Sequence, residues 1–141
     1  MKISQDKKVF ITGCGGMLGK AVYEQFAPHC QVLATDIDLN EPWLEYGDVI
    51  DFQKISEKAF KFEPDLIINL AALTDLEFCE RNPEITWKTN ALGAENMALI
   101  SKTVDAAHIY ISTAGIFDGQ KEYYNDFEQP NPLSVYAKSK Y

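Results

Sequence analysis

Basic residues and long apolar stretches are both scarce in this chain. Thirteen Lys and Arg residues stand against twenty-one Asp and Glu residues, a net charge of −8, and no Lys/Arg-rich run interrupts this acidic balance. A surface that follows a nucleic-acid backbone needs clustered positive charge, so no nucleic-acid partner is expected. No stretch approaches the roughly 18 apolar residues of a membrane-spanning helix, so no membrane partner is expected either.

Cysteines are also few, and their pattern excludes two further classes of protein. The three cysteines are odd in number and form no Cys-x-x-Cys pair. This fits neither a disulfide framework nor a zinc site and is typical of a reducing compartment. Residues 1–8 lack the apolar core of a secretion signal. The sequence therefore predicts a cytoplasmic protein without a metal site, since neither His29 nor His108 has another plausible ligand nearby.

What is present is the composition of an ordinary globular protein. The 141 residues are 46% hydrophobic and 12% aromatic. A chain of this size can bury a core as a single domain. We therefore expect one domain over residues 1–141, with a small molecule as its partner.

Apolar runs alternate with amphipathic segments along the chain. The runs predict strands at 9–12, 32–36, 66–70 and 109–112, with Val49-Ile50 as a further short strand. Helical spacing of apolar residues predicts helices over 17–26, 52–62 and 83–102, and a last one that Asn131 caps and Pro132 opens. Residues 66–70 are apolar almost throughout, as in a strand covered on both faces. The sequence predicts a Rossmann-like, doubly wound parallel sheet in an α/β fold with three α/β/α layers.

This Rossmann domain is expected to be incomplete. The chain ends within the last predicted helix, and no strand follows it to bury the inner face of that helix. A crossover helix normally leads back into its sheet, so we expect an N-terminal part of a longer protein, truncated after the fifth strand. The unpaired edge of the last strand and the apolar face beside it favour self-association, so a homo-oligomer is expected.

A glycine-rich segment, Thr12 to Gly19, lies between the first predicted strand and the first predicted helix. Its glycine spacing permits a tight turn and a close backbone approach, and the start of the helix presents free N–H groups to a pyrophosphate. A plain turn with close helix packing is the alternative. The segment predicts a dinucleotide site formed by Gly13, Gly16, Met17, Leu18 and Gly19.

Asp36 ends the second predicted strand, 17 positions after Gly19. A carboxylate about 20 residues beyond the glycines accepts hydrogen bonds from the adenosine ribose in dinucleotide-binding folds. A 2′-phosphate would meet a like charge at Asp36, and no Arg follows in the loop to neutralise it. Asp36 therefore favours NAD(H), with NADP(H) as the alternative cofactor and a solvated strand-end carboxylate as the other interpretation.

Tyr136 and Lys140 lie four positions apart on the last predicted helix, so both side chains project from one face. A phenol with its ordinary pKa of about 10 delivers a proton near neutral pH only where its phenolate is stabilised. The ammonium group of Lys140 would stabilise it. Ser112 and Thr113, at the end of a strand, would direct a hydroxyl at a carbonyl oxygen. The predicted catalytic residues are Thr113, Tyr136 and Lys140.

These motifs occur in the order found in the extended short-chain dehydrogenase/reductase superfamily, which the chain resembles over essentially its whole length. They are the glycine loop, Asp36, Asn69 to Ala72, Asn90, Ser112-Thr113 and Tyr136 to Lys140. Within that superfamily the chain is most similar to the dTDP-4-dehydrorhamnose reductase family. The segments that carry this similarity are Gly47 to Asp51, Asn69 to Asp75, Thr89 to Gly93 and Ile111 to Gly119.

The resemblance implies an NAD(P)H-dependent reduction of a keto group on a nucleotide-activated deoxysugar. It implies that Tyr136 is the acid, that Lys140 is its electrostatic partner and holds a cofactor ribose, and that Thr113 orients the carbonyl. It also implies further cofactor-binding residues: Asp48 and Val49 near the adenine, Ala71 and Ala72 near the two riboses, and Asn90 behind Lys140.

Two departures from the family pattern leave alternatives open. Ala114-Gly115 stands where the family usually has Asp-Tyr, which removes a carboxylate and a ring from the site wall, so the sugar nucleotide stays unassigned. Family members are about twice this length, which implies that this chain alone does not turn over. The alternatives are an epimerase or dehydratase of the same superfamily, a non-catalytic dinucleotide-binding module, and a flavodoxin-like domain.

Overall fold

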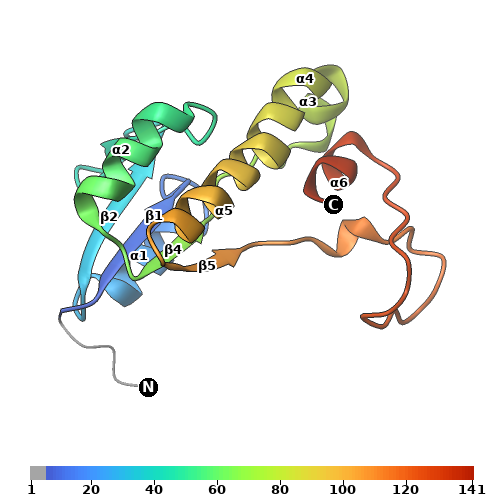
Figure 1. Cartoon of the computed structure of the whole chain (residues 1–141). Coiled ribbons are helices and arrows are strands. Elements are labelled where there is room, and N and C mark those ends of the chain that lie inside the picture. The colour runs from blue at the N-terminus through green and yellow to red at the C-terminus, as the bar shows by residue number, and fades with distance from the viewer. Residues whose placement is uncertain (1–5) are drawn as a thin grey trace.

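The computed structural model describes residues 6–141 and contains one five-stranded, all-parallel sheet (Figure 1). The strand order is β3-β2-β1-β4-β5, so the direction of winding reverses between β1 and β4. This is the predicted doubly wound, Rossmann-like α/β fold. The strands are β1 (Lys8–Thr12), β2 (Gln31–Asp36), β3 (Glu45–Tyr46), β4 (Leu66–Asn69) and β5 (Ala107–Tyr110).

Helices cover both faces of the sheet (Figure 1). The connecting helices are α1 (Gly19–Phe26) after β1, α2 (Phe52–Phe62) before β4, and α5 (Gly93–Thr103) before β5. Side chains alternate along a strand. In β1, Ile11 belongs to a cluster against which Val22 and Phe26 of α1 pack, whereas Phe10 belongs to a cluster with residues of α2 and α5. The sheet is therefore the middle layer, with α1 on one face and α2 and α5 on the other.

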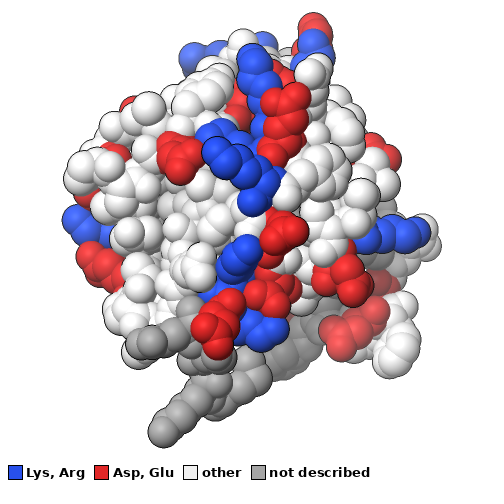
Figure 2. All heavy atoms as spheres, turned by 60° about the vertical axis from the view of Figure 1, so that its left-hand side comes forward, with Lys and Arg blue, Asp and Glu red and all other residues white. Residues whose placement is uncertain are grey.

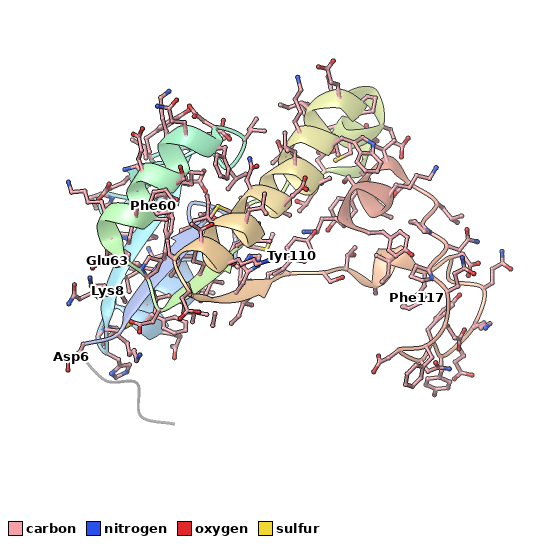
Figure 3. The ribbon with its side chains drawn as sticks, viewed as in Figure 1. Asp6, Lys8, Phe60, Glu63, Tyr110 and Phe117 are labelled. Carbon is pink, nitrogen blue, oxygen red and sulfur yellow. The ribbon has the colours of Figure 1, made fainter. Side chains whose placement is uncertain are left out.

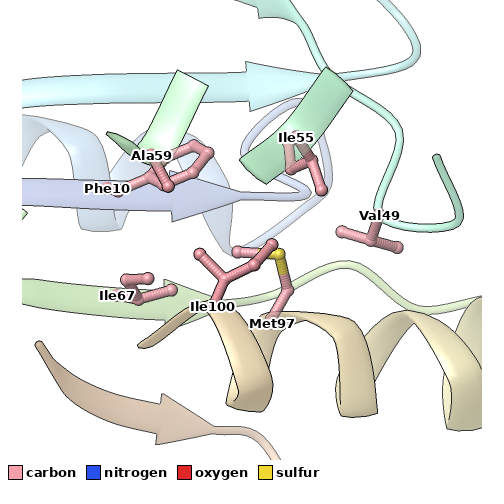
Figure 4. Close-up of a cluster of buried hydrophobic side chains, with 7 residues drawn as sticks. All are labelled: Phe10, Val49, Ile55, Ala59, Ile67, Met97 and Ile100. Atoms are coloured by element: carbon pink, nitrogen blue, oxygen red, sulfur yellow. The ribbon is translucent and has the colours of Figure 1, made fainter. Parts of the chain in front are cut away.

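The core between the sheet and the α2/α5 layer is shown in Figure 4. Strand residues meet helix residues there, and the buried cluster is Phe10, Val49, Ile55, Ala59, Ile67, Met97 and Ile100. Phe10 and Ile67 come from neighbouring central strands and are completely buried. Because both faces of β1 and β4 are covered, each contains three consecutive apolar residues rather than an alternating pattern.

The strand predicted at Val49-Ile50 is wrong, since β3 lies earlier, at Glu45–Tyr46. The Asp48 side chain accepts a hydrogen bond from the Ile50 N–H, and the Asp51 side chain accepts one at the start of α2. Residues 48–51 therefore turn the chain into α2. Val49 is buried in the core from this turn, which accounts for its apolar character without a strand.

The helix predicted over 83–102 is divided into three consecutive segments, α4 (Pro83–Trp87), the π-helix η1 (Lys88–Leu92) and α5. A helix that the sequence analysis did not predict, α3 (Leu76–Arg81), precedes them. Its cap is Asp75, whose carboxylate accepts the Phe78 N–H. Single-turn π-helices often occur at functional sites, and η1 contains Asn90.

Two other predicted boundaries shift by a few residues. The strand predicted at 109–112 is β5, Ala107–Tyr110, and it ends where its partner β4 ends, at the Asn69–Tyr110 pair. The helix predicted from residue 17 begins at Gly19, because a turn closed by the Gly19 N–H and the Gly16 carbonyl precedes it.

The last helix, α6 (Val135–Lys140), begins later than predicted. Its cap is Ser134, whose hydroxyl accepts a backbone N–H of the first turn. The carboxylate of Glu80, from α3, accepts the Val135 N–H at 2.7 Å. α6 lies beside α3 and α4 (Figure 1).

Asn131 does not cap α6, because its side chain is hydrogen-bonded within the loop that precedes the helix. Residues 111–134 extend away from the sheet and include the 3-10 helix η2 (Ala114–Ile116) (Figure 1). The Asp118 carboxylate organises this loop by accepting hydrogen bonds from Tyr124 at 2.5 Å and from Asn131 at 2.9 Å. These bonds hold the pKa of Asp118 at about 2.

Charges of both signs are interleaved on the molecular face shown in Figure 2. On α2, Lys58 pairs with Glu45 at 2.7 Å, and Lys54 pairs with Asp51 at 2.9 Å. Within residues 6–141 no helix is long and apolar enough to cross a membrane. The same residues contain no group of three His, Cys, Asp or Glu side chains placed to hold a metal ion.

Candidate functional site

A cavity of about 470 Å³ lies beyond the C-terminal ends of β1, β2 and β4. Ligands of doubly wound sheets bind at this edge, where the strand order reverses. Seven of the predicted cofactor residues line the cavity: Gly13, Gly16, Asp36, Asp48, Val49, Ala71 and Ala72. Segments that are far apart in the sequence thus meet in one hollow.

Gly13 brings the glycine loop into direct contact with the segment after β4. Its φ is +69°, and a Cβ atom at this position would lie 2.3 Å from the backbone nitrogen of Ala71. An L side chain is therefore excluded both by backbone conformation and by space. This close approach forms the floor of the cavity.

The start of α1 leaves backbone donors free. Within residues 6–141 the N–H groups of Met17 and Leu18 have no hydrogen-bond partner, whereas the N–H groups of Gly16 and Gly19 are bonded inside the loop. Free N–H groups and the positive end of a helix dipole attract an anion. The loop therefore fits a pyrophosphate group, although Met17, Leu18 and Gly19 do not line the cavity itself.

Asp36 is held at the cavity by backbone hydrogen bonds. Its Oδ2 accepts the Gly15 N–H at 2.8 Å, and its Oδ1 accepts the Asp38 N–H at 2.9 Å. Each carboxylate oxygen has a second lone pair. Asp36 lines the cavity and is oriented so that it can accept further hydrogen bonds there, for example from hydroxyl groups.

The buried amide of Asn69 shapes the wall after β4. Its Oδ1 accepts the Thr12 hydroxyl at 2.9 Å and the Ala71 N–H at 3.1 Å. The Nδ2 atom is buried and has no partner within the described part of the chain. Asn69 thereby ties β4 to β1 and sets the position of Ala71 and Ala72.

Asn90 joins this wall to α6. It is almost completely buried, and its amide pairs with the backbone of Leu73, accepting the N–H at 2.7 Å and donating to the carbonyl at 2.9 Å. It also donates to the Ser139 hydroxyl at 3.0 Å. Asn90 does not line the cavity, but it holds the residue next to Lys140.

Lys140 is a nearly buried cation, with 8% of its surface exposed. Its Nζ lies 4.0 Å from the centroid of the Tyr110 ring, and burial lowers the pKa of Lys140 to about 8. Tyr110 projects from the end of β5 (Figure 3), and its pKa is raised by burial and by the nearby Tyr136. Tyr110 therefore interacts both with the Lys140 ammonium and with Tyr136.

Thr113 lies beside the helix that carries the other two predicted catalytic residues. Its hydroxyl accepts the Gly115 N–H at 3.1 Å, and η2 contacts α6. A Cβ atom on Gly115 would lie 3.7 Å from that of Ala137. The structure thus brings Thr113 close to α6, while none of Thr113, Tyr136 and Lys140 lines the cavity.

Sequence analysis did not single out Tyr110, Gly15 or Thr89 for the site. Gly15 and Thr89 line the cavity, and Tyr110 contacts Lys140. The available signal for Tyr110 is its place within the predicted strand 109–112, two positions before Ser112. Gly15 was passed over because it falls outside the three-residue glycine spacing.

The RmlD substrate binding domain family matches residues 7–141. The chain belongs to this family. Two solved structures, both described as dTDP-4-dehydrorhamnose reductases, are similar to it. The Bacillus anthracis protein, in complex with NADP, is 31% identical, with a TM-score of 0.87, and the match covers 97% of this chain and 47% of that one. The hypothetical Sulfolobus tokodaii reductase is 32% identical, with a TM-score of 0.89 and coverage of 94% and 49%.

Curated relatives of this RmlD-family chain carry two kinds of name. Methionine adenosyltransferase 2 subunit beta from Xenopus tropicalis is 33% identical over 135 residues, which are 95% of this chain and 40% of the relative. The probable low-salt glycan biosynthesis reductase Agl14 from Haloferax volcanii is 29% identical over 136 residues, 93% and 45% of the two chains. The chain spans less than half the length of these relatives.

We predict that Lys140 titrates near pH 8, because burial disfavours its ammonium form. NMR titration of the lysine side chains measures the midpoint, and Lys140→Met identifies the resonance by removing it. The folded pKa lies below the unfolded value of about 10.4, so the unfolded chain binds more protons between these two pH values. Stability relative to Lys140→Met should therefore rise from about pH 8 to about pH 10.4. A midpoint above pH 10 contradicts a desolvated Lys140.

Proposed function

We propose that this chain is the cofactor-binding and catalytic-residue part of an NAD(P)H-dependent reductase. The substrate of the proposed enzyme is a keto group on a nucleotide-activated deoxysugar, as the names of the dTDP-4-dehydrorhamnose reductases suggest. The observation that carries the proposal is the position of Asn90, whose amide bonds join the cavity wall at Leu73 to the helix bearing Tyr136 and Lys140. The proposed dinucleotide site and the proposed proton donor, Tyr136, are thereby held in fixed positions relative to each other.

The cofactor of the proposed enzyme is a nicotinamide dinucleotide, which supplies a hydride when bound. The free N–H groups of Met17 and Leu18 would hold its pyrophosphate, and Asp36 would accept the hydroxyls of its adenosine ribose. Asp36 makes NAD(H) the preferred form. NADP(H) is the alternative, because the Bacillus anthracis relative is in complex with NADP.

The protein's part in the reaction is proton transfer and orientation. Tyr136 would donate its phenolic proton to the carbonyl oxygen as the carbon is reduced, which leaves an alcohol and a phenolate. The buried Lys140 ammonium would stabilise that phenolate, since charges interact more strongly away from water. Thr113 would donate a hydrogen bond to the same carbonyl oxygen.

Cofactor affinity tests the first half of this proposal. We expect saturable NADH binding to the chain in a fluorescence titration, with NADPH bound more weakly. Asp36→Ala should weaken NADH about tenfold and improve NADPH relative to NADH, because a hydrogen bond to a charged group and a like-charge repulsion are both removed. Asp126→Ala, in the loop after η2, is the matched control and should change neither. A folded chain that binds neither cofactor contradicts the proposal.

Turnover tests the second half. The proposed reductase needs a further part to grip the sugar, so this chain alone should not oxidise NADH in the presence of a nucleotide 4-keto sugar. A chimera completed with the remaining half of the Bacillus anthracis reductase should consume NADH steadily. Tyr136→Phe should lower that rate at least about a hundredfold, the usual contribution of a general acid.

The outcome of the chimera experiment also separates the reductase from an epimerase or dehydratase. Those enzymes recycle their cofactor, so the chimera would convert the sugar without net NADH consumption. A rate that Tyr136→Phe leaves unchanged would rule out the assigned acid.

A second candidate is a non-catalytic dinucleotide-binding subunit. It is favoured by the 33% identity to a protein named as a subunit of methionine adenosyltransferase 2 and by Ala114-Gly115, where the reductase pattern has Asp-Tyr. This candidate predicts that the chain binds cofactor and co-elutes with a methionine adenosyltransferase in size-exclusion chromatography. It also predicts a chimera without turnover.

A further inference from the structure

Residues 36–41 fold back over the glycine loop and bind it at Gly15. The Gly15 N–H donates to Asp36 Oδ2 at 2.8 Å. The Gly15 carbonyl accepts from Asn40 Nδ2 at 3.0 Å. Both polar backbone groups of Gly15 are therefore bonded to the same short segment after β2.

This contact leaves little space for a Cβ atom on Gly15. A Cβ atom there would lie 3.0 Å from Asp36 Cγ, 3.0 Å from the Asp38 carbonyl oxygen and 3.1 Å from Asn40 Oδ1. The other carboxylate oxygen of Asp36 accepts the Asp38 N–H. The Asp36 carboxylate is thus fixed from two sides, with the Gly15 peptide as one of its supports.

The donors of the glycine loop consequently have separate tasks. The Gly15 N–H orients Asp36 and is not available to a phosphate, whereas the N–H groups of Met17 and Leu18 are free within the described residues. The orientation of Asp36 therefore depends on what holds Gly15 in place. Asn40 holds the Gly15 carbonyl, which lies in the peptide after the one that donates to Asp36, and the N–H of that same peptide, from Gly16, is bonded to the Gly13 carbonyl at 3.3 Å.

The residue after Asn40 ties the same segment to α1. Glu41 accepts a hydrogen bond from Lys20 at 3.1 Å, and Lys20 lies in the first turn of α1. A 2′-phosphate placed at Asp36 would meet the carboxylates of Asp36 and Asp38, while Lys20 is already paired. The charges of this segment therefore disfavour binding of an additional phosphate.

We propose that Asn40 is a positioning residue for cofactor choice. By holding the Gly15 carbonyl, Asn40 restrains the backbone angles of Gly15 and keeps the Asp36 carboxylate where it accepts hydrogen bonds from ribose hydroxyls and repels a 2′-phosphate. Without the Asn40 amide, Gly15 can turn about these angles, and the N–H bond to Asp36, one of its two backbone donors, is weakened. This inference rests on the proposed function, because it concerns the ribose end of the same dinucleotide site.

The test compares NADH and NADPH dissociation constants for the 141-residue chain and its variants by fluorescence titration. Asn40→Ala should reduce the preference for NADH over NADPH about three- to tenfold, the effect of one lost hydrogen bond. In an Asp36→Ala background the same change should leave the ratio within about twofold, because Asn40 acts through Asp36. Asn125→Ala, in which another exposed loop amide is removed, should keep the wild-type ratio.

Hydrogen exchange at the Gly15 amide gives a readout without cofactor. The Gly15 N–H should be protected in the wild type and exchange at least about tenfold faster in Asn40→Ala and in Asp36→Ala, while circular dichroism shows that each variant is folded. Unchanged protection of the Gly15 N–H in Asn40→Ala overturns the role of Asn40 in holding Gly15.

The outcomes separate this inference from the proposed function. A wild type that prefers NADH, together with an Asn40→Ala variant that keeps the full preference, overturns the positioning role alone. A wild type that binds both cofactors equally also overturns it. A folded wild type that binds neither cofactor overturns both proposals.

Discussion

The buried amide of Asn90 is the interaction on which the two halves of the candidate site depend. Apart from this amide, α6 contacts α3, α4 and η2, and its Lys140 lies over the Tyr110 ring of β5. The Asn90 side chain hydrogen-bonds both polar backbone groups of Leu73 and also the hydroxyl of Ser139. A buried amide with unmade hydrogen bonds is costly, so this geometry strongly favours one position of α6 relative to the cavity wall.

The electrostatics of the site follow from unequal burial. Asp36 stays partly exposed and is held by backbone N–H groups, so it suits a ligand that brings hydroxyls. Lys140 is nearly buried, which lowers its pKa to about 8, and its ammonium lies over the Tyr110 ring. In the proposed enzyme, one end of the site would select the ligand and the other would support proton transfer.

The elements that can be predicted from the sequence are those in which local pattern and layer position coincide. The β1–glycine loop–α1 unit and β4 were predictable because their apolar runs face covered layers. The start of α6 could not be predicted, because Asn131 and Ser134 are both good helix caps. The later start is supported by Glu80, which accepts the N–H of Val135, 55 positions away in the sequence. The turn at Val49 was misread because a buried turn residue looks like a strand residue.

The candidate site shows the same division. Asp36 and the glycine loop were found from their place at strand ends. Tyr110 and Asn40 were not, because their roles consist of contacts with Lys140 and Gly15, which are distant in the sequence. No local periodicity encodes such contacts. They emerge only when the sheet order places the segments side by side.

Chemical-shift mapping of the isotope-labelled chain with NADH tests the central claim most directly. The account predicts shifts at the amides of Met17 and Leu18, at the cavity residues around Asp36 and Ala71, and, transmitted through Asn90, at Ser139. Shifts confined to a second hollow, about 500 Å³ in volume and lined by residues such as Lys58 and Phe62, would contradict it. So would a spectrum that NADH leaves unchanged.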